Sequence, residues 1–139
     1  MRLWHKDLIS VLPRQQLLGQ WRECCLIARN IAKNGATGHI LVNKIMDYPH
    51  DEFNAYADAV YKEMVRRGYK TDSWRFFMWR DDVNTPPLSI IFRGWHNTRY
   101  LTQCYYNLEE KYDCGGISEE EMEKIARKLY IVAFDTKGR

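Results

Sequence analysis

Residues 13–35, PRQQLLGQWRECCLIARNIAKNG, decide the fold of this 139-residue chain. Pro13 suits a first helical position because its missing N–H would have no partner there, and Gly35 is a natural left-handed cap. Between them, apolar side chains recur at the three- and four-residue spacing of one helix face. These side chains are Leu17, Leu18, Trp21, Cys24, Cys25, Ala28 and Ile31. The stretch therefore predicts one long amphipathic helix.

The opposite side of this helix is polar and raises a question of function. Its residues are Gln15, Gln16, Gly19, Arg22, Glu23, Arg29 and Asn30. Arg22 and Glu23 are adjacent, so on a helix they point about 100° apart and do not pair with each other. The pattern leaves two readings open. The pair is either a solvated edge, with Arg22 lying over the ring of Trp21, or part of a functional site.

A second helix is expected over about residues 50–67, with Gly68 as its cap. Its buried stripe consists of Phe53, Ala57, Val60, Met64 and Val65. The chain from 74 to 95 is aromatic and irregular, because Pro86 and Pro87 interrupt any helix there. This segment is expected to connect helices rather than to form one.

A third helix is expected over about 95–112, where the glycines at 115 and 116 stop it. Ser118 and Glu121 form a capping box that begins a fourth helix at about 119–130. The segment YIVAF, residues 130–134, could pair as an edge strand or pack on the core. The sequence therefore predicts a mainly α, compact single domain over residues 1–139, with about four helices and irregular aromatic connections.

Composition agrees with a packed globule, since 45% of the residues are hydrophobic and 14% are aromatic. No apolar run approaches the roughly 20 residues that span a bilayer. The start, MRLWHKDLISVLP, carries charge within its apolar stretch and has no small-residue cleavage site, unlike a secretory signal. We therefore expect a cytoplasmic protein without a membrane partner.

Cysteine spacing and charge distribution indicate which metal sites and binding partners to expect. Cys24, Cys25, Cys104 and Cys114 contain no C-x-x-C pair, so we expect buried reduced thiols and no metal site. Residues 1–35 carry six basic and two acidic side chains, whereas residues 105–125 carry two basic and seven acidic ones. This asymmetry permits an anionic partner at the N-terminal side.

Two segments carry a resemblance to a known family. MRLWHKDLISVLPRQQLLGQWRE, residues 1–23, resembles the start of the pyrimidine-dimer DNA glycosylases, small helical repair enzymes of the phage endonuclease V class. DEFNAYADAVYKEMVRRGYKTD, residues 51–72, is similar to the second helix of that family and its basic, glycine-containing end. Beyond Asp72 the resemblance is thin.

The resemblance implies a covalent amine mechanism. In the family, the α-amino group of the first residue is the nucleophile and a helix glutamate is its acidic partner, which places these roles on Met1 and Glu23. An α-amino group has a pKa of about 7.7–8.0, so part of it is neutral at physiological pH, unlike a lysine. The implied activity is glycosylase and abasic-site lyase action on damaged double-stranded DNA, possible substrates including pyrimidine dimers, with no metal or organic cofactor.

The same resemblance implies a set of DNA-binding residues. These are Arg2, Gln15, Gln16, Arg22 and Arg29. The phage enzyme loses its initiator methionine and has an arginine three residues after the glutamate. Here a retained Met1 would supply the amine and Arg2 would take the arginine's place next to it. Leu26 stands where the other arginine would be, so Arg29 would take over its work.

Two aromatic and basic segments leave alternatives open. SWRFFMWR, residues 73–80, offers Trp74, Arg75, Trp79 and Arg80 as a stacking and phosphate surface, or else places Phe76, Phe77 and at least one tryptophan in the core. RGWHNTR, residues 93–99, places Arg93, His96 and Arg99 near a helix start, where phosphate can bind. His96 is otherwise a surface histidine or one satisfied within the fold.

Two further function classes stay open from the residues. The chain could be a nucleic-acid-binding module that kept this scaffold without the chemistry. It could also be a helical protein-interaction domain in which Arg22 and Glu23 are only a polar face.

Overall fold

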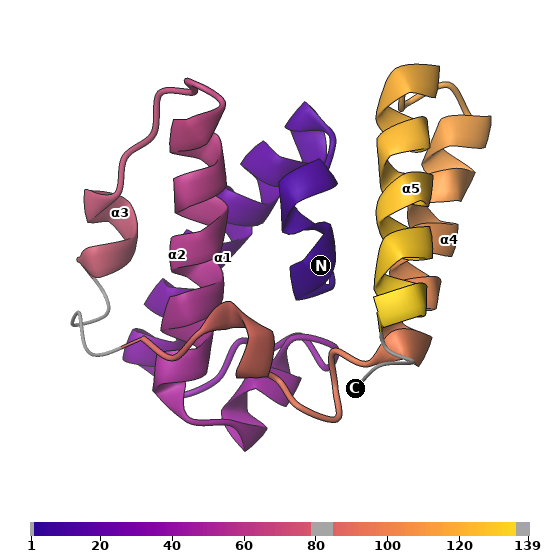
Figure 1. Cartoon of the computed structure of the whole chain (residues 1–139). Coiled ribbons are helices and arrows are strands. Elements are labelled where there is room, and N and C mark those ends of the chain that lie inside the picture. The colour runs from indigo at the N-terminus through magenta and orange to yellow at the C-terminus, as the bar shows by residue number, and fades with distance from the viewer. Residues whose placement is uncertain (1, 79–84, 136–139) are drawn as a thin grey trace. The chain divides into compact units, whose positions relative to one another are not determined.

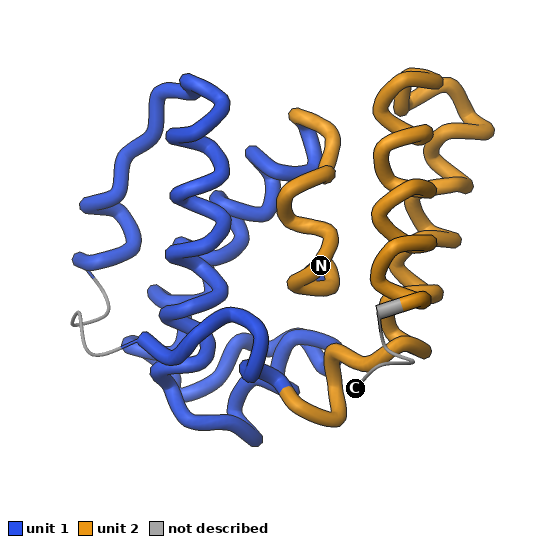
Figure 2. The backbone as a smooth tube through the Cα atoms, viewed as in Figure 1, with its two compact units in different colours: residues 1–3, 15–92 blue, residues 4–14, 93–139 orange. Residues whose placement is uncertain are grey.

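The computed structural model describes residues 2–78 and 85–135 and confirms a mainly α fold (Figure 1). The four long helices are α1 (Arg14–Asn34), α2 (His50–Arg66), α4 (Thr98–Asp113) and α5 (Glu119–Asp135). The short ones are η1 (Lys6–Val11), η2 (Asn43–Asp47), α3 (Trp74–Phe77) and η3 (Leu88–Ile90). The described residues contain no strand. They divide into two compact units, of residues 1–3 with 15–92 and residues 4–14 with 93–139 (Figure 2).

In the first unit, α1, α2 and α3 meet around the buried ring of Phe76. Its centroid lies 6.0 Å from the ring of Trp21 on α1 and 5.7 Å from that of Phe53 on α2. Trp21, Phe53 and Phe76 are each at most 5% exposed, which confirms the apolar stripes of both helices at these positions. Gly35 and Gly68 end the two helices with φ of 75° and 80°, as their sequences predict.

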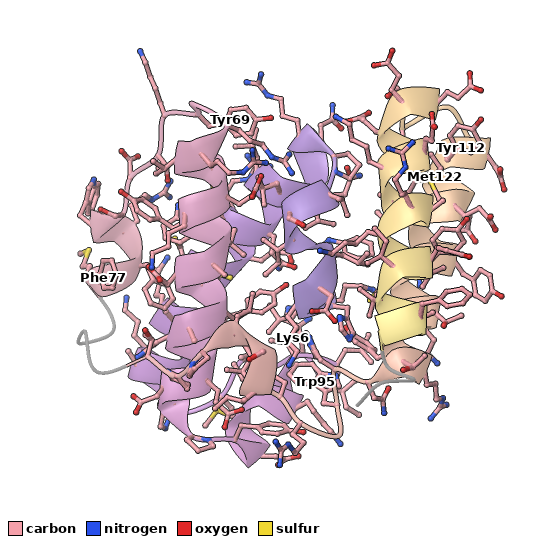
Figure 3. All side chains as sticks on the ribbon, in the orientation of Figure 1. Lys6, Tyr69, Phe77, Trp95, Tyr112 and Met122 are labelled. Carbon is pink, nitrogen blue, oxygen red and sulfur yellow. The ribbon has the colours of Figure 1, made fainter. Side chains whose placement is uncertain are left out.

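Two side chains expected in this core lie at the surface. Val65 is 51% exposed, because it neighbours Met64 on α2 and only one of the two can face the core. Phe77 is 42% exposed and lies on the outer side of α3 (Figure 3). The short helix α3 turns Phe76 inward, so the residue after it points away. The prediction for Phe76 is confirmed, and those for Val65 and Phe77 are wrong.

In the second unit, α4 and α5 form a helical hairpin (Figure 1), and η1 packs against α5. The predicted capping box is present: Glu121 donates its backbone N–H to Ser118 Oγ at 3.1 Å, and Ser118 donates its own to Glu121 Oε1 at 3.0 Å. YIVAF continues α5 as helix, so the edge-strand alternative is wrong. No glycine or proline interrupts this segment, and Tyr130 and Phe134, one turn apart, bring their ring centroids to 4.4 Å.

A pair of buried histidines anchors the start of the second unit. His96 Nδ1 accepts the backbone N–H of Lys6 at 2.9 Å, and its ring stacks on that of His5 at 5.0 Å. Burial lowers the pKa of His96 to about 2, so the ring is neutral and can accept this bond at physiological pH. Helix α4 begins at Thr98 rather than near Trp95, because the side chain of Asn97 caps it by accepting the N–H of Tyr100 at 2.9 Å.

Candidate active site

Glu23 lies on α1 at the end of a buried hydrogen-bond network. Gln20, one turn earlier and 1% exposed, donates from Nε2 to Glu23 Oε2 at 3.1 Å. The same nitrogen donates to the backbone carbonyl of Arg2 at 3.2 Å. Tyr56 on α2 donates its hydroxyl to Gln20 Oε1 at 2.9 Å. Both N–H bonds and the carbonyl of the Gln20 side chain are thereby used, which fixes the orientation of the amide.

This network ties the start of the chain to the carboxyl group of Glu23. Arg2 and Glu23 are far apart in sequence, yet both accept a hydrogen bond from one nitrogen atom. Leu3, the next residue, is fully buried and holds the segment in place. Met1 lies outside the described residues. The Gln20 side-chain amide therefore links the Glu23 carboxyl group to the backbone carbonyl of Arg2.

Burial raises the pKa of Glu23 above its usual value of 4.5. The positive charge of Arg22, the hydrogen bond from Gln20 and the charge of His39 each work against that rise. The carboxyl is partly exposed, so a substrate can reach it. A carboxyl group in such a place can exchange protons with a substrate closer to neutral pH than an ordinary glutamate can.

A cationic pocket of about 340 Å³ opens on the same helix. Its basic side chains are Arg22, Arg29 and Lys33 from α1 and Arg75 from α3. Cys25, Leu26, Trp74 and Met78 complete the lining. Arg22, Arg29 and Arg75 are exposed, and the Trp74 side chain is 63% exposed. Four cations around an aromatic ring suit an anionic, planar ligand such as a nucleotide.

The remaining predicted residues lie in different surroundings. Gln15 is exposed on α1, and Arg2 is partly exposed. Gln16 is partly buried, and its Oε1 has no hydrogen-bond partner among the described residues. Trp79 and Arg80 lie outside the described residues.

The residues of RGWHNTR belong to the second unit. Arg93 and Arg99 are exposed, but His96 is 6% exposed and receives the Lys6 N–H. His96 therefore lies inside the fold and not on an exposed phosphate-binding surface. Of the cysteines, Cys24, Cys25 and Cys104 are buried, whereas Cys114 is exposed beyond the end of α4, so the expectation of a buried thiol is wrong there.

Gln20 and Tyr56 did not emerge from the sequence as site residues. One signal for Gln20 was present, because it lies three residues after Leu17 and four before Cys24, on the buried stripe of α1. A polar side chain at such a position needs buried hydrogen-bond partners. Nothing in the sequence of α2 distinguishes Tyr56 from its other buried residues.

Comparison with known proteins places this chain in a family. Residues 1–75, which include Glu23, Gln20 and the α1 side of the cationic pocket, match the family of pyrimidine dimer DNA glycosylases. The fold and this match define the protein as a helical DNA repair glycosylase, whose substrate is DNA. The chain belongs to the pyrimidine dimer DNA glycosylase family, which confirms the resemblance seen in its first 72 residues.

No curated protein and no solved structure gives a significant match to the chain. Among the described residues, no helix combines the length and the apolar character needed to cross a membrane.

Proposed function

We propose that this protein excises a damaged base from double-stranded DNA and then cleaves the strand at the abasic site. The α-amino group of Met1 acts as the nucleophile, and Glu23 acts as its carboxylate partner. The observation that supports this pairing is the Gln20 amide, which binds the carbonyl of Arg2 and the carboxyl of Glu23 with one nitrogen. Residue 2 is covalently joined to Met1, and this bond limits how far the α-amino group can lie from the Arg2 carbonyl.

The chemistry needs a neutral amine and a nearby negative charge. The amine nitrogen attacks C1′ of the damaged nucleotide, and the glycosidic bond breaks with its electron pair leaving on the base, which takes up a proton. Loss of a proton from nitrogen and opening of the sugar ring give an imine. The imine makes the C2′ proton acidic, and its removal expels the 3′ phosphate by β-elimination. Glu23 stabilises the cationic sugar and carries protons between these steps.

The cationic pocket supplies contacts to the DNA backbone. Arg22 and Arg29 bind phosphates near the lesion, and the exposed ring of Trp74 offers a surface for stacking. Arg2 and Gln15 lie near the start of the chain and of α1, where they contact the sugar and phosphates of the attacked strand. Gln16, which is partly buried on the same helix, completes the set of residues that contact the attacked strand.

Borohydride trapping tests the proposal. Borohydride reduces an imine to a stable amine, so wild-type protein mixed with abasic duplex DNA should yield a covalent adduct, and peptide mapping should locate it on Met1. Glu23→Gln should still bind DNA but lose strand cleavage. DNA binding without any adduct would instead support a nucleic-acid-binding module, and an adduct on a lysine would exclude Met1 as the nucleophile.

A further inference from the structure

Two large aliphatic side chains stand in solvent at the tip of a turn between α1 and η2. Ile40 is 89% exposed and Leu41 is 60% exposed, and they are adjacent in sequence. Val42, the next residue, is fully buried. Of the three consecutive apolar residues in this turn, only Val42 is buried, whereas Ile40 and Leu41 are exposed. The two side chains offer exposed apolar surface that another molecule can cover.

The turn is fastened on both sides. Thr37, 6% exposed, donates its N–H to Asn43 Oδ1 at 3.0 Å. The N–H of His39 is donated to Thr37 Oγ1 at 3.2 Å. The carbonyl of His39 accepts the N–H groups of Val42 and Asn43 at 3.0 and 2.8 Å. These hydrogen bonds give the tip of the turn a defined geometry. A turn that is already ordered loses little conformational entropy when it binds a partner.

This turn and the candidate active site belong to the same compact unit. Burial is the main influence on the Glu23 carboxyl and raises its pKa, and the charge of His39 is among those that oppose the rise. His39 directly precedes Ile40 and Leu41. The exposed pair is therefore presented next to the residue whose charge reaches the catalytic carboxyl.

We propose that Ile40 and Leu41 form a wedge that enters the base stack of duplex DNA beside the nucleotide under attack. This inference rests on the proposed function. A nucleotide must leave the stack before its C1′ can be reached, and apolar side chains inserted between base steps replace the stacking that is lost. Arg22 and the other cations of the pocket would hold the backbone, whereas the wedge would contact only bases. The wedge residues carry no charge, so they act on the opening of the duplex and not on the chemistry.

The double variant Ile40→Ala/Leu41→Ala tests the wedge on two substrates that differ only in stacking. One is a duplex with a pyrimidine dimer, and the other is the same strand without its complement, so only the duplex requires the damaged nucleotide to leave a base-paired stack. The variant should cleave the duplex roughly tenfold more slowly than wild type and the single strand at the wild-type rate, since the single strand needs no opening. A matched control, Val65→Ala/Ile90→Ala, removes two aliphatic side chains that are 51% and 50% exposed and should change neither rate.

A second readout does not depend on the chemistry. With 2-aminopurine next to the lesion, binding of wild type should increase the fluorescence because the neighbouring base unstacks, and the double variant should bind without this increase. Failure of trapping by wild type, with the fluorescence difference intact, would refute the nucleophile and support the wedge. Equal rate losses on both substrates, or equal fluorescence for both proteins, would overturn the wedge. A dimer that the double substitution dissociates, with fluorescence unchanged, would show that the pair binds a second copy of the chain.

Discussion

Gln20 and Glu23 are joined by a hydrogen bond of 3.1 Å along one turn of α1, and Gln20 is almost completely buried while Glu23 reaches the surface. The bond connects the interior of the first unit to the candidate site. The Tyr56 hydroxyl orients the Gln20 amide by donating to its Oε1, and Gln20 Nε2 also donates to the carbonyl of Arg2. The position of the carboxyl is thus set by a residue that need not touch DNA.

Gln20→Leu should lower the cleavage rate and move its pH dependence. Leucine keeps the site buried but removes the hydrogen bond that holds down the pKa of Glu23, so this pKa rises further. If the ionised carboxylate is required, activity is then lost at a higher pH as the solution is acidified. A displaced carboxyl should also reduce the rate roughly tenfold to a hundredfold. Single-turnover cleavage of abasic duplex DNA from pH 5 to about 9, within the range in which such groups titrate, measures both effects.

Gln103→Leu, on the exposed side of α4, is the matched control and should leave rate and profile unchanged. A Gln20→Leu protein that is slower at every pH by the same factor would show that the amide positions the carboxyl without altering its titration. An unaltered rate would show that the amide serves only the fold.

Tyr56→Phe should lower the free energy of unfolding, because it removes a buried hydrogen bond. The hydroxyl is buried and its removal leaves Gln20 Oε1 without this donor, a loss of about 1–3 kcal/mol in the free energy of unfolding. Urea denaturation followed by circular dichroism measures the change. Tyr106→Phe removes a hydroxyl from a residue that is 60% exposed and should alter the midpoint little. Equal midpoints for the two variants would mean that the Tyr56 bond adds nothing net.

The helices and their ends could be predicted because local rules fix them. Gly35 and Gly68 take positive φ as helix caps, and the capping box of Ser118 and Glu121 forms as its spacing requires. These features depend on residues within one turn of each other. YIVAF was ambiguous because a short apolar run has no helical or strand period of its own, and the preceding helix decided it.

The site could be predicted only in part, because its geometry depends on contacts between distant segments. Glu23, Arg22 and Arg29 were proposed from the family resemblance, because the polar face of α1 alone left the role of Arg22 and Glu23 open. Gln20 was missed because its partners lie on residues 2 and 56, and no spacing rule connects these positions. The exposure of Ile40 could not be predicted either, since an apolar residue in a loop is as easily buried as presented.

Glu23→Gln should make the protein more stable at neutral pH. A carboxyl whose pKa is raised by burial costs stability when ionised, and this cost grows as pH rises from the usual value of 4.5 through the raised value of the folded protein. Glutamine stays neutral, so it avoids the cost. Melting temperatures from pH 4 to about 8 should therefore show a gap in favour of the variant that closes as the pH falls. Glu110→Gln, at an exposed position of α4, controls for the general effect of removing a negative charge. A gap that widens toward acid would mean that the pKa of Glu23 is lowered instead.

Arg29→Ala should weaken DNA binding in a way that depends on salt. Arg29 lines the cationic pocket, and a contact to one phosphate releases about one counterion, so the slope of log K against log salt should become shallower by about 0.9. Fluorescence anisotropy with a labelled abasic duplex over a series of salt concentrations measures the slope. Arg127→Ala is the matched control, because Arg127 is an exposed arginine of α5 that pairs with Glu123 at 3.0 Å and should leave the slope unchanged. Because the lost contact is to the backbone, Arg29→Ala should weaken binding to damaged and undamaged DNA by the same factor. A loss confined to damaged DNA would instead assign Arg29 to reading the lesion.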